Sequence, residues 1–409
     1  MRFHVPLKLS KSRTLKITIT TLTLCTLLAI GYNYTHLLLP AELNNGETPV
    51  KVMQEPPFQN TSKTNLYHDK RKGNDVLLTL VRNTEIDQIV KTIENFENNF
   101  NSKYHYDWWF MNDEDFTQEF QERVEDAVSG RTKFIKIPEE LWSYPDYIDR
   151  KKADASRKAY SDANIMYGDS ESYRFMCRFN SGMFYKIPEL ENIEYYWRIE
   201  PGTKFNCEIT YDVFQYMRKY NKLYAFNMAL QEDVRTIPTL WNATMEFLEK
   251  NPRAISENNL AGFVSDDHSN SYNLCHFWSN FEIASTEFFK SPVYETYFDF
   301  LDHKGGFFYE RWGDAPVHTL AVSLMLPANR VHFVANTGYY HKPNRDCPPN
   351  DELRDALHCQ CNPHNDFTWH KYSCVHKFFS LQNLVRPDSL EHISMVYPTI
   401  FDTIMNPKN

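Results

Sequence analysis

Glycine and net positive charge are both scarce in this sequence, and each scarcity excludes a class of protein. The chain has 409 residues but only 12 glycines, and it contains neither a GxGxxG nor a Walker-type loop. A Rossmann dinucleotide site or a P-loop is therefore not expected. The formal net charge of -9 provides no basic footprint, so no nucleic-acid partner is expected. Aromatic residues, by contrast, make up 15% of the chain, which argues against disorder and favours stacking surfaces for a sugar or a nucleotide.

The N-terminal segment has the pattern of a membrane anchor followed by a stem. Basic residues are frequent in residues 1–16, and residues 17–39 then form an uncharged run rich in Leu, Ile and Thr. A run of this length suits a hydrocarbon layer of ~30 Å, and its basic flank predicts a cytoplasmic tail and a lumenal body. Residues 40–73 hold several prolines among polar residues without apolar periodicity, which is typical of a stem. We therefore expect a type II signal-anchor ahead of a lumenal catalytic domain at 74–409, with a cleaved signal peptide as the alternative.

Cysteine usage agrees with an oxidising lumen. Beyond Cys25 in the apolar run, seven cysteines remain, an odd number that leaves at least one free or paired between chains. Four of them lie between Cys347 and Cys374 with three histidines among them, so zinc is an alternative to disulfides. The Cys359-Gln-Cys361 spacing is tighter than a normal C-x2-C knuckle, and the compartment is oxidising. The sequence therefore favours disulfides that staple a loop-rich region.

Apolar segments of strand and helix periodicity alternate at the start of the body. Strands are predicted at 75–82, 106–110 and 133–137, and helices at 85–100 and 116–127. This alternation predicts an α/β domain that opens with a parallel sheet. Ligands of such sheets bind at the carboxyl ends of the strands, which makes Arg82 a candidate nucleotide contact. The other expected elements are strands at 195–201, 223–229 and 331–334, helices at 151–159, 212–218 and 292–301, an apolar helix that ends at 326, and a loop at 339–341.

Carboxylates framed by aromatic residues are the first candidates for chemistry. Glu200, Glu282 and Asp314 each lie beside aromatic residues in the sequence. Burial in such a setting raises the pKa of a carboxyl unless a cation or hydrogen bonds hold its charge. Each is alternatively a structural ion-pair partner, for example of Arg198 or Arg311. Three such carboxylates in one chain favour an acidic, aromatic cleft.

Two segments combine aromatic rings with polar groups. Residues 272–284 carry a carboxylate, an imidazole, a thiol, an amide and several rings, a mixture typical of a sugar-binding cleft. Residues 173–185 carry Arg178 and Asn180 among aromatic residues, an arrangement suited to a diphosphate or a sugar. An ordinary helix with a solvated basic edge is the alternative for this second segment. These features leave sugar transfer, sugar cleavage and sugar binding all open.

Eight short blocks, taken in order along residues 75–376, resemble one known family. That family is the fungal Golgi α-1,2-mannosyltransferases, glycosyltransferase family 15. Any one block is only suggestive, whereas all of them in order are a strong signal, and the predicted anchor and stem agree with it. The blocks are 79–83 (TLVRN), 106–108 (YDW), 172–174 (SYR), 177–182 (CRFNSG), 195–201 (YYWRIEP), 275–283 (CHFWSNFEI), 310–318 (ERWGDAPVH) and 338–341 (GYYH).

The resemblance implies a fold, a reaction and a place in the cell. The implied fold is of the GT-A type, with a single mixed central sheet flanked by helices. The implied reaction moves mannose from GDP-mannose, with retention and with Mn²⁺, to a mannose residue of an N- or O-linked glycan. The new linkage would be α-1,2, with α-1,3 as the alternative. The resemblance also implies a catalytic domain in the Golgi lumen, tethered to the Golgi membrane.

The resemblance further assigns roles to matching residues. Glu200 matches a metal-site carboxylate, and His341 matches a histidine that ligates Mn²⁺ together with the GDP diphosphate. Glu282 matches a carboxylate proposed as nucleophile, although support of a front-face attack is the alternative. The remaining matches are Tyr173 as an active-site tyrosine, Arg82 in the nucleotide pocket and Asp314 as a candidate acceptor contact.

Two positions depart from the family pattern. Residues 221–235, and especially 231–235, diverge from it, which is expected to alter the acceptor groove. Gly202 stands where some relatives carry an acidic residue, so a second metal carboxylate is not expected there. A catalytically silent mannan-binding or scaffolding subunit of a Golgi complex is the main alternative function, and a glycoside hydrolase is a third. The presence of Glu200, Glu282 and His341 together favours the enzyme.

Overall fold

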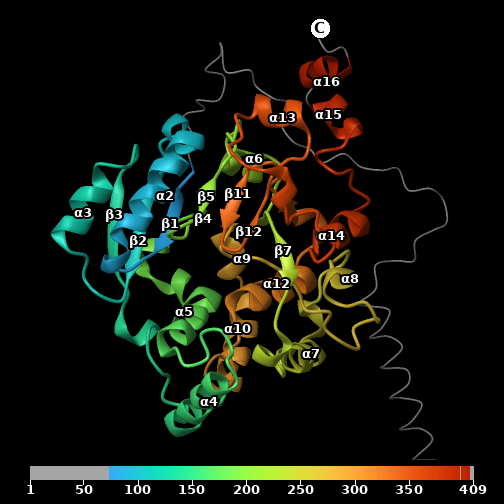
Figure 1. Cartoon of the computed structure of the whole chain (residues 1–409). Helices are drawn as coiled ribbons and strands as arrows, with labels where there is room; N and C mark the ends of the chain where they lie inside the picture. The colour runs from blue at the N-terminus through green and yellow to red at the C-terminus, as the bar shows by residue number, and fades with distance from the viewer. Residues whose placement is uncertain (1–72, 397, 406–409) are drawn as a thin grey trace, which may run out of the picture.

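The computed structural model of the chain describes residues 73–396 and 398–405 (Figure 1). The expected cytoplasmic tail, the signal-anchor at 17–39 and nearly all of the stem lie outside these residues. Within the described ranges, no helix combines the length and the apolar character that crossing a membrane requires.

A seven-stranded mixed sheet forms the centre of the fold, in the order β10-β6-β9-β4-β1-β2-β3. Strands β1 to β4 run parallel, and β10 is parallel to β6, whereas β9 is antiparallel to both β4 and β6. The alternation in the sequence therefore correctly predicted a parallel start, and the expected mixed sheet is confirmed. The strands are β1 Asp75–Leu80, β2 Asp107–Asn112, β3 Thr132–Lys136, β4 Tyr195–Arg198, β6 Tyr224–Phe226, β9 Glu282–Ser285 and β10 Val331–Phe333.

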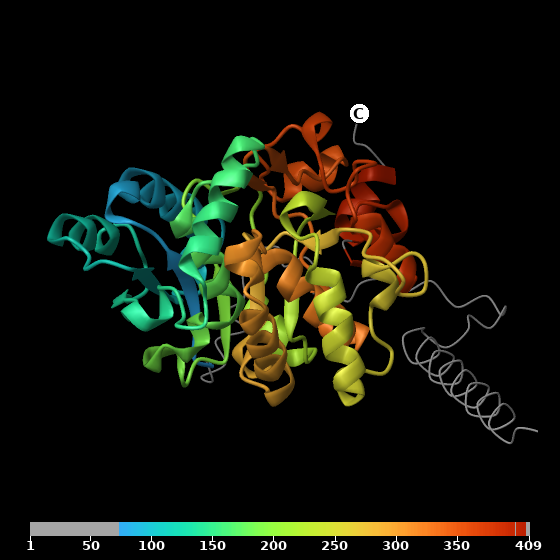
Figure 2. The same ribbon diagram turned by 90° about the horizontal axis from the view of Figure 1, so that it is seen from below.

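Helices cover both faces of the sheet, because its strands are apolar on both sides. In β1, Val76 and Leu78 enter one hydrophobic core, and Leu77 between them enters the other. Helices α2, α3 and α6 pack on the Leu77 face, and α5, α10 and α12 pack on the opposite face (Figures 1 and 2). Their bounds are α2 Ile86–Asn99, α3 Gln118–Glu125, α5 Glu171–Gly182, α6 Val213–Lys219, α10 Pro292–Lys304 and α12 Asp314–Met325.

Local sequence signals determine where several of these helices begin and end. The hydroxyl of Ser170 accepts a hydrogen bond from the backbone N–H of Tyr173 at 3.1 Å, which caps the start of α5. Ser291 caps α10 in the same way, with Pro292 in the first turn. Gly305 ends α10 at a φ of 73°, a left-handed conformation that favours glycine.

Two small sheets flank the central one. One has the order β12-β11-β5, with β5 Lys204–Phe205, β11 Tyr339–His341 and β12 Asn344–Arg345, and the other pairs β7 Ala229–Gln231 with β8 Cys275–Phe277. The expectation of a loop at 339–341 was wrong: these residues form β11, because β5 pairs with it in an antiparallel register. The other helices are α4 Arg150–Asp162, α7 Leu240–Lys250, α8 Ala261–Val264, α9 Thr286–Phe289, α11 Gly306–Tyr309, α13 Asp351–Ala356, α14 Val375–Gln382, α15 Leu390–Val396 and α16 Pro398–Met405.

Candidate active site

A cleft of about 610 Å³ opens at the carboxyl ends of the parallel strands. Arg82 follows β1, Asn112 ends β2 and Glu200 follows β4, and all three line the cleft. Because β9 is antiparallel to β4, its first residue, Glu282, reaches the same edge of the sheet. The volume lies within the ~300–1,000 Å³ typical of small-molecule sites. The cleft therefore occupies the usual ligand position of an α/β sheet.

Glu282 is a buried residue of the cleft wall that hydrogen-bonds with three side chains. The Tyr196 hydroxyl donates to Oε1 at 2.5 Å, and the Tyr224 hydroxyl donates to Oε2 at 2.8 Å. Nδ1 of His318, on α12, lies 2.7 Å from the same Oε2. Burial opposes the negative charge, but His318 and Arg198 outweigh it and lower the pKa of the Glu282 carboxyl. Glu282 is therefore an ionised carboxylate held in one orientation.

His318 carries the matching positive charge. Burial disfavours the imidazolium, but Glu282 outweighs that effect and raises the pKa of His318 above its ordinary value. The imidazole packs against Phe289 of α9, with ring centroids 4.7 Å apart. Both members of the pair are almost completely buried, so removal of either one leaves an uncompensated charge in the protein interior.

Arg198 connects two other carboxylates of the cleft. Its Nη1 donates to Oδ2 of Asp314 at 2.6 Å, and its Nη2 donates to Oε1 of Glu200 at 2.5 Å. The hydroxyl of Ser279 donates to the same Oδ2 of Asp314 at 2.7 Å. Burial would raise the pKa of Glu200, but Arg198 and His341 outweigh it and lower this pKa to about 2. Glu200 is therefore ionised at neutral pH, as a metal ligand must be.

Glu200 and His341 form the candidate metal pair. Oε2 of Glu200 lies 3.4 Å from Nε2 of His341. The two residues meet because β5, shortly after Glu200, pairs with β11, which ends at His341. A carboxylate oxygen and an imidazole nitrogen suit Mn²⁺, and two protein ligands leave its other positions to phosphate oxygens and water. The donor chemistry of this pair thus fits an Mn²⁺ ion shared with a diphosphate.

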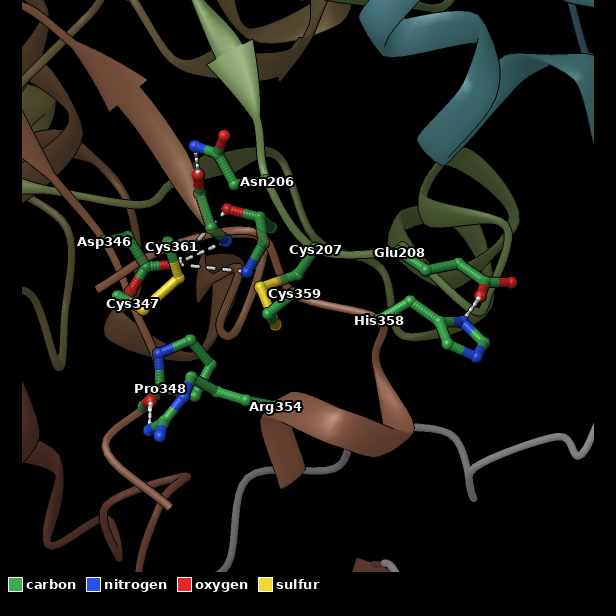
Figure 3. The surroundings of a disulfide bond; sticks show 12 residues. Asn206, Cys207, Glu208, Asp346, Cys347, Pro348, Arg354, His358, Cys359 and Cys361 are labelled. Carbon is green, nitrogen blue, oxygen red and sulfur yellow. Dashed lines mark hydrogen bonds and ion pairs between the residues drawn. A yellow bond between two sulfur atoms is a disulfide. The ribbon is translucent and has the colours of Figure 1, made fainter. Parts of the chain in front are cut away.

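The disulfide between Cys207 and Cys359 (Figure 3) supports β11, the strand that carries His341, because Cys207 follows β5 and β5 pairs with β11. Cys207, which follows β5, is bonded to Cys359, and its backbone N–H donates to the carbonyl of Thr337 at 3.2 Å. Gly338 has a φ of 62°, and a Cβ atom there would lie 2.7 Å from the Cys207 nitrogen. Only glycine fits this approach, so the GYYH block begins with glycine for a steric reason.

The other cysteines confirm the expectation of disulfides. Cys275 is bonded to Cys374 and Cys347 to Cys361, and Cys177 is a buried free thiol. The sulfur atoms of Cys207, Cys359 and Cys361 lie within 4.8 Å of one another. Within the described ranges, this is the only group of three or more histidine, cysteine, aspartate or glutamate side chains that are close enough together to hold a metal ion. Each of these sulfur atoms belongs to a disulfide, so none of them is a thiolate that could bind zinc.

The cleft is also lined by three more residues that the sequence had predicted as site residues. Nη2 of Arg82 contacts the hydroxyl of Ser172, just ahead of Tyr173. The ring of Tyr173 stacks on that of Tyr167, with centroids 4.5 Å apart and planes 14° from parallel. Asn180, in the last turn of α5, lines the same cleft. The structure thus brings Arg82, Tyr173 and Asn180 to one cleft with Glu200, Glu282, Asp314 and His341.

Arg178 does not lie at the cleft, which corrects the sequence interpretation of this residue. Its Nε and Nη2 atoms donate to the two carboxylate oxygens of Asp302 on α10, each at 2.8 Å. Both side chains are almost completely buried, with exposures of 6% and 4%. Arg178 therefore binds α5 to α10 as half of a bidentate ion pair and is not placed to contact a diphosphate or a sugar.

Residues 34–383 match the family model described as glycolipid 2-alpha-mannosyltransferase. The chain belongs to this family.

Named relatives and solved structures of the family are similar over most of the chain. Glycolipid 2-alpha-mannosyltransferase 1 of Candida albicans is 47% identical over 361 residues, which are 86% of this chain and 83% of that protein. Alpha-1,2 mannosyltransferase KTR1 of Saccharomyces cerevisiae is 50% identical over 76% of this chain and 79% of its own length. The crystal structure of core-mannan synthase A from Aspergillus fumigatus in its Mn/GDP form shares 37% identity and a TM-score of 0.73, over 85% of this chain and 94% of that one. The mannosyltransferase Ktr4p of S. cerevisiae, solved with GDP, shares 33% identity and a TM-score of 0.74, over 90% and 93%.

Membership in the family confirms two predictions made from the sequence. The resemblance to the fungal mannosyltransferases is correct, and the chain is a mannosyltransferase. Its α/β fold with a mixed central sheet matches the solved GT-A-like structures of the family.

Several residues of the site were not predicted as site residues. Tyr196 and Arg198 alternate with Tyr195 and Trp197 along β4 and share a side with Glu200, so the period of two was a usable signal. His318 is the last residue of the ERWGDAPVH block, but nothing in the sequence around it predicts its contact with Glu282. Two other contributors carry no comparable signal in their own segments, Tyr224 on β6 and Ser279 before β9.

Proposed function

We propose that this mannosyltransferase transfers mannose from GDP-mannose to a mannose residue of an N- or O-linked glycan, with Mn²⁺, and forms an α-1,2 linkage with retention of configuration. The observation that carries the proposal is one cleft in which the ionised Glu282 lies with the metal pair Glu200 and His341. The printed names of the relatives include alpha-1,2 mannosyltransferase, and one solved family member contains manganese and GDP. Both facts support the same donor and cofactor here.

The residues of the cleft fit the charges that such a transfer develops. The mannosyl group passes through an oxocarbenium-like state, and an ionised carboxylate such as Glu282 stabilises its positive charge. The metal, when bound, neutralises negative charge on the departing GDP. Arg198 keeps Glu200 ionised and therefore able to ligate the metal. No side chain needs to donate a proton to a diphosphate leaving group.

The surroundings of Glu282 favour one of two roles for it. A carboxylate offers about four lone-pair sites, and Tyr196, Tyr224 and His318 occupy three of them. A carboxylate satisfied in this way is a weak nucleophile but a fixed source of negative charge. We therefore favour electrostatic support of a front-face attack over a covalent glycosyl-enzyme.

We also propose that the chain is a single-pass type II protein of the Golgi membrane. Residues 1–16 would be cytoplasmic, 17–39 would form the signal-anchor, 40–73 the stem, and 74–409 the lumenal catalytic domain. The basic flank of the apolar run and the three disulfides support this orientation. Protease treatment of intact Golgi vesicles tests it: an epitope at the C-terminus should be protected, and one at the N-terminus should be removed.

The transferase activity is tested directly with the purified full-length protein. It is incubated with GDP-mannose, Mn²⁺ and either α-methylmannoside or mannobiose, and the formation of a longer mannoside is measured. We expect transfer with Mn²⁺ and none after chelation. GDP binding without transfer to any mannoside would instead support a silent mannan-binding subunit. Cleavage of mannosides in the absence of GDP-mannose would support a hydrolase.

A further inference from the structure

Two of the three disulfides share one short segment of the chain. Cys359 is bonded to Cys207, and Cys361, two residues after Cys359, is bonded to Cys347 (Figure 3). The sulfur atoms of Cys207, Cys359 and Cys361 all lie within 4.8 Å of one another. Folding alone brings Cys207 to this segment, because 152 positions separate it from Cys359. A sulfur atom of one disulfide therefore lies beside the other disulfide.

In each of these two disulfides, one cysteine is closed to solvent and the other is open to it. Cys207 and Cys347 are buried, with exposures of 0% and 1%. Cys359 and Cys361 are both partly exposed. Thiol–disulfide exchange needs direct access to a sulfur atom. An external thiolate can therefore attack either bond only at Cys359 or Cys361.

Backbone hydrogen bonds hold this arrangement together independently of the sulfur–sulfur bonds. The N–H of Gln360 donates to the carbonyl of Asn206 at 2.6 Å, so the residue before Cys361 is bound to the residue before Cys207. A second backbone bond of 2.8 Å, from the residue after Cys207 to the carbonyl of Leu357, continues this pairing. Reduction of the disulfide of Cys361 therefore leaves its sulfur beside that of Cys207, at a high effective concentration.

The burial of the sulfur atoms determines the direction of an exchange. A Cys361 thiolate that attacks Sγ of Cys359 would release a Cys207 thiolate in a fully buried position, and burial among apolar groups disfavours a thiolate. Attack on Sγ of Cys207 instead releases the Cys359 thiolate, which solvent reaches. Exchange is faster when the leaving thiol has the lower pKa, so attack on Cys207 is favoured.

We propose that Cys361 is an internal nucleophile that takes over the bond to Cys207 when the disulfide between Cys347 and Cys361 is reduced. One thiolate of an external dithiol attacks Sγ of Cys361 and releases Cys347, and the second thiolate then displaces Cys361 as the dithiol closes into a cyclic disulfide. Two electrons and two protons thus pass from the dithiol to the two cysteines. The Cys361 thiolate next forms a bond to Sγ of Cys207, the bond between Cys207 and Cys359 breaks, and the released thiolate takes up a proton. This second step is redox-neutral, because one disulfide replaces another.

The exchange preserves the support of the strand that carries His341. Cys207 follows β5, β5 pairs with β11, and β11 ends at His341. In the exchanged form Cys207 stays bonded, to Cys361 in place of Cys359. The two disulfides together thus form an anchor with a reserve, which survives the reduction of one of them. This consequence rests on the proposed Mn²⁺ site at Glu200 and His341, whereas the exchange itself does not.

Peptide mapping of the full-length protein tests the exchange. Cys347→Ser frees Cys361 without any reductant. The matched control is Cys374→Ser, which frees Cys275: in the described ranges, no third cysteine sulfur lies within 4.8 Å of both members of that pair. Each protein is quenched in acid, because the thiolate is the nucleophile, and is then unfolded, alkylated and digested. Cys177, the buried free thiol, is labelled in every sample and serves as the reference.

We expect the alkyl label in Cys347→Ser to be divided between Cys359 and Cys361. A peptide linked through Cys207 and Cys361 should appear beside the native peptide linked through Cys207 and Cys359. In the control, Cys374→Ser, both native bonds of the shared segment should remain intact, without a mixed peptide. Label confined to Cys361 in Cys347→Ser, or label at Cys207, would overturn the proposed exchange.

Partial reduction of the wild-type protein repeats the test without a substitution, and it decides alone if Cys347→Ser does not fold. A graded series of dithiothreitol concentrations is quenched in acid and mapped in the same way. Among the molecules that have lost one disulfide, we expect the peptide linked through Cys207 and Cys361. A series that contains only native bonds and their reduced cysteines would overturn the exchange.

Calorimetric titration with Mn²⁺ in the presence of GDP tests the consequence for the metal pair. Cys347→Ser should keep the Kd for Mn²⁺ near the wild-type value, because the exchange maintains the anchor. Cys207→Ser, which no exchange can repair, should raise this Kd roughly tenfold, as the loss of support around a metal ligand implies. Equal Kd values for Cys207→Ser and the wild type would overturn the anchoring role. Absence of Mn²⁺ binding to the wild type would overturn the proposed metal site, and the peptide maps would still decide the exchange.

Discussion

His318 Nδ1 lies 2.7 Å from Oε2 of Glu282, and the two side chains form a buried ion pair at the cleft. The pair couples a residue of α12 to the first residue of β9. It explains why a carboxylate with almost no solvent contact stays ionised. It also makes His318 a positioning residue for Glu282, because the imidazole contacts the carboxylate and does not itself line the cleft.

Substitution of His318 should change the pH dependence of transfer. His318→Asn keeps a donor near the position of Nδ1 but removes the charge, and His318→Phe removes both. Without the imidazolium, the pKa of Glu282 rises because burial is opposed only by Arg198 and Tyr196, and the acid limb of the kcat profile moves to higher pH. We expect kcat at neutral pH to fall roughly 10- to 100-fold in His318→Phe and less in His318→Asn, with the Kd for GDP unchanged. Wild-type profiles in both variants would contradict the role given to the pair.

His341→Ala should weaken the dependence on Mn²⁺ without unfolding the protein. The substitution removes one of two protein ligands, so the Mn²⁺ concentration for half-maximal activity should rise by at least about tenfold. His303→Ala, at an exposed position of α10, is the control and should leave the titration unchanged. The measurement is transfer rate against free Mn²⁺. A His341→Ala curve that overlays the wild type would remove His341 from the metal site.

Arg178→Met should reduce stability and leave catalysis intact, because Arg178 pairs with Asp302 away from the cleft. Loss of one partner of a buried pair lowers the free energy of unfolding by roughly 3–5 kcal/mol. Denaturant unfolding measures that loss, and steady-state kinetics on the folded fraction should give wild-type KM for GDP-mannose. The double variant Arg178→Met with Asp302→Leu should regain part of the stability. A raised KM for GDP-mannose at wild-type stability would restore Arg178 to the nucleotide site.

Asp346 gives the folded protein an unusual dependence on pH. Burial and the neighbouring Asp366 raise the pKa of this carboxyl to about 7, above its unfolded value of 3.8. The folded state therefore holds a proton that the unfolded state has released, and stability falls as pH rises from about 4 to 7. The effect is measured as a negative slope of the unfolding free energy against pH in this window. Asp346→Asn should flatten the slope in this window, whereas Asp87→Asn, at a fully exposed site, should keep it.

The periodicity of apolar residues predicted most helices and strands of the fold. It could not predict features that depend on pairing between strands far apart in the sequence. The apolar run after residue 74 and the helix that follows it were visible because each carries its own period. The direction of β9 was not, since only its pairing with β4 sets Glu282 opposite Arg198. β11 was missed because it is three residues long and is a strand only through its pairing with the two residues of β5.

In the candidate site, too, local sequence predicted some residues correctly, and long-range packing determined the others. Glu200, Glu282 and His341 stood out because a carboxylate or an imidazole among aromatic residues is unusual. Arg178 stood out for the same reason, yet its partner, Asp302, lies 124 positions away and faces it only after folding. Sequence alone identifies unusual residues; the packing of α5 against α10 determines which of them reach the cleft.

The transfer that we propose for the cleft around Glu282 joins mannose, with retention, to O2 of a mannoside. Its most direct test is the NMR structure of the product formed by the full-length protein from GDP-mannose and α-methylmannoside with Mn²⁺. We predict one product, with an α-anomeric proton and a linkage at O2, and a loss of at least about a thousandfold in its rate of formation in Glu282→Gln, equivalent to about 4 kcal/mol of transition-state stabilisation. A β-linked product, or wild-type rates from Glu282→Gln, would contradict this account.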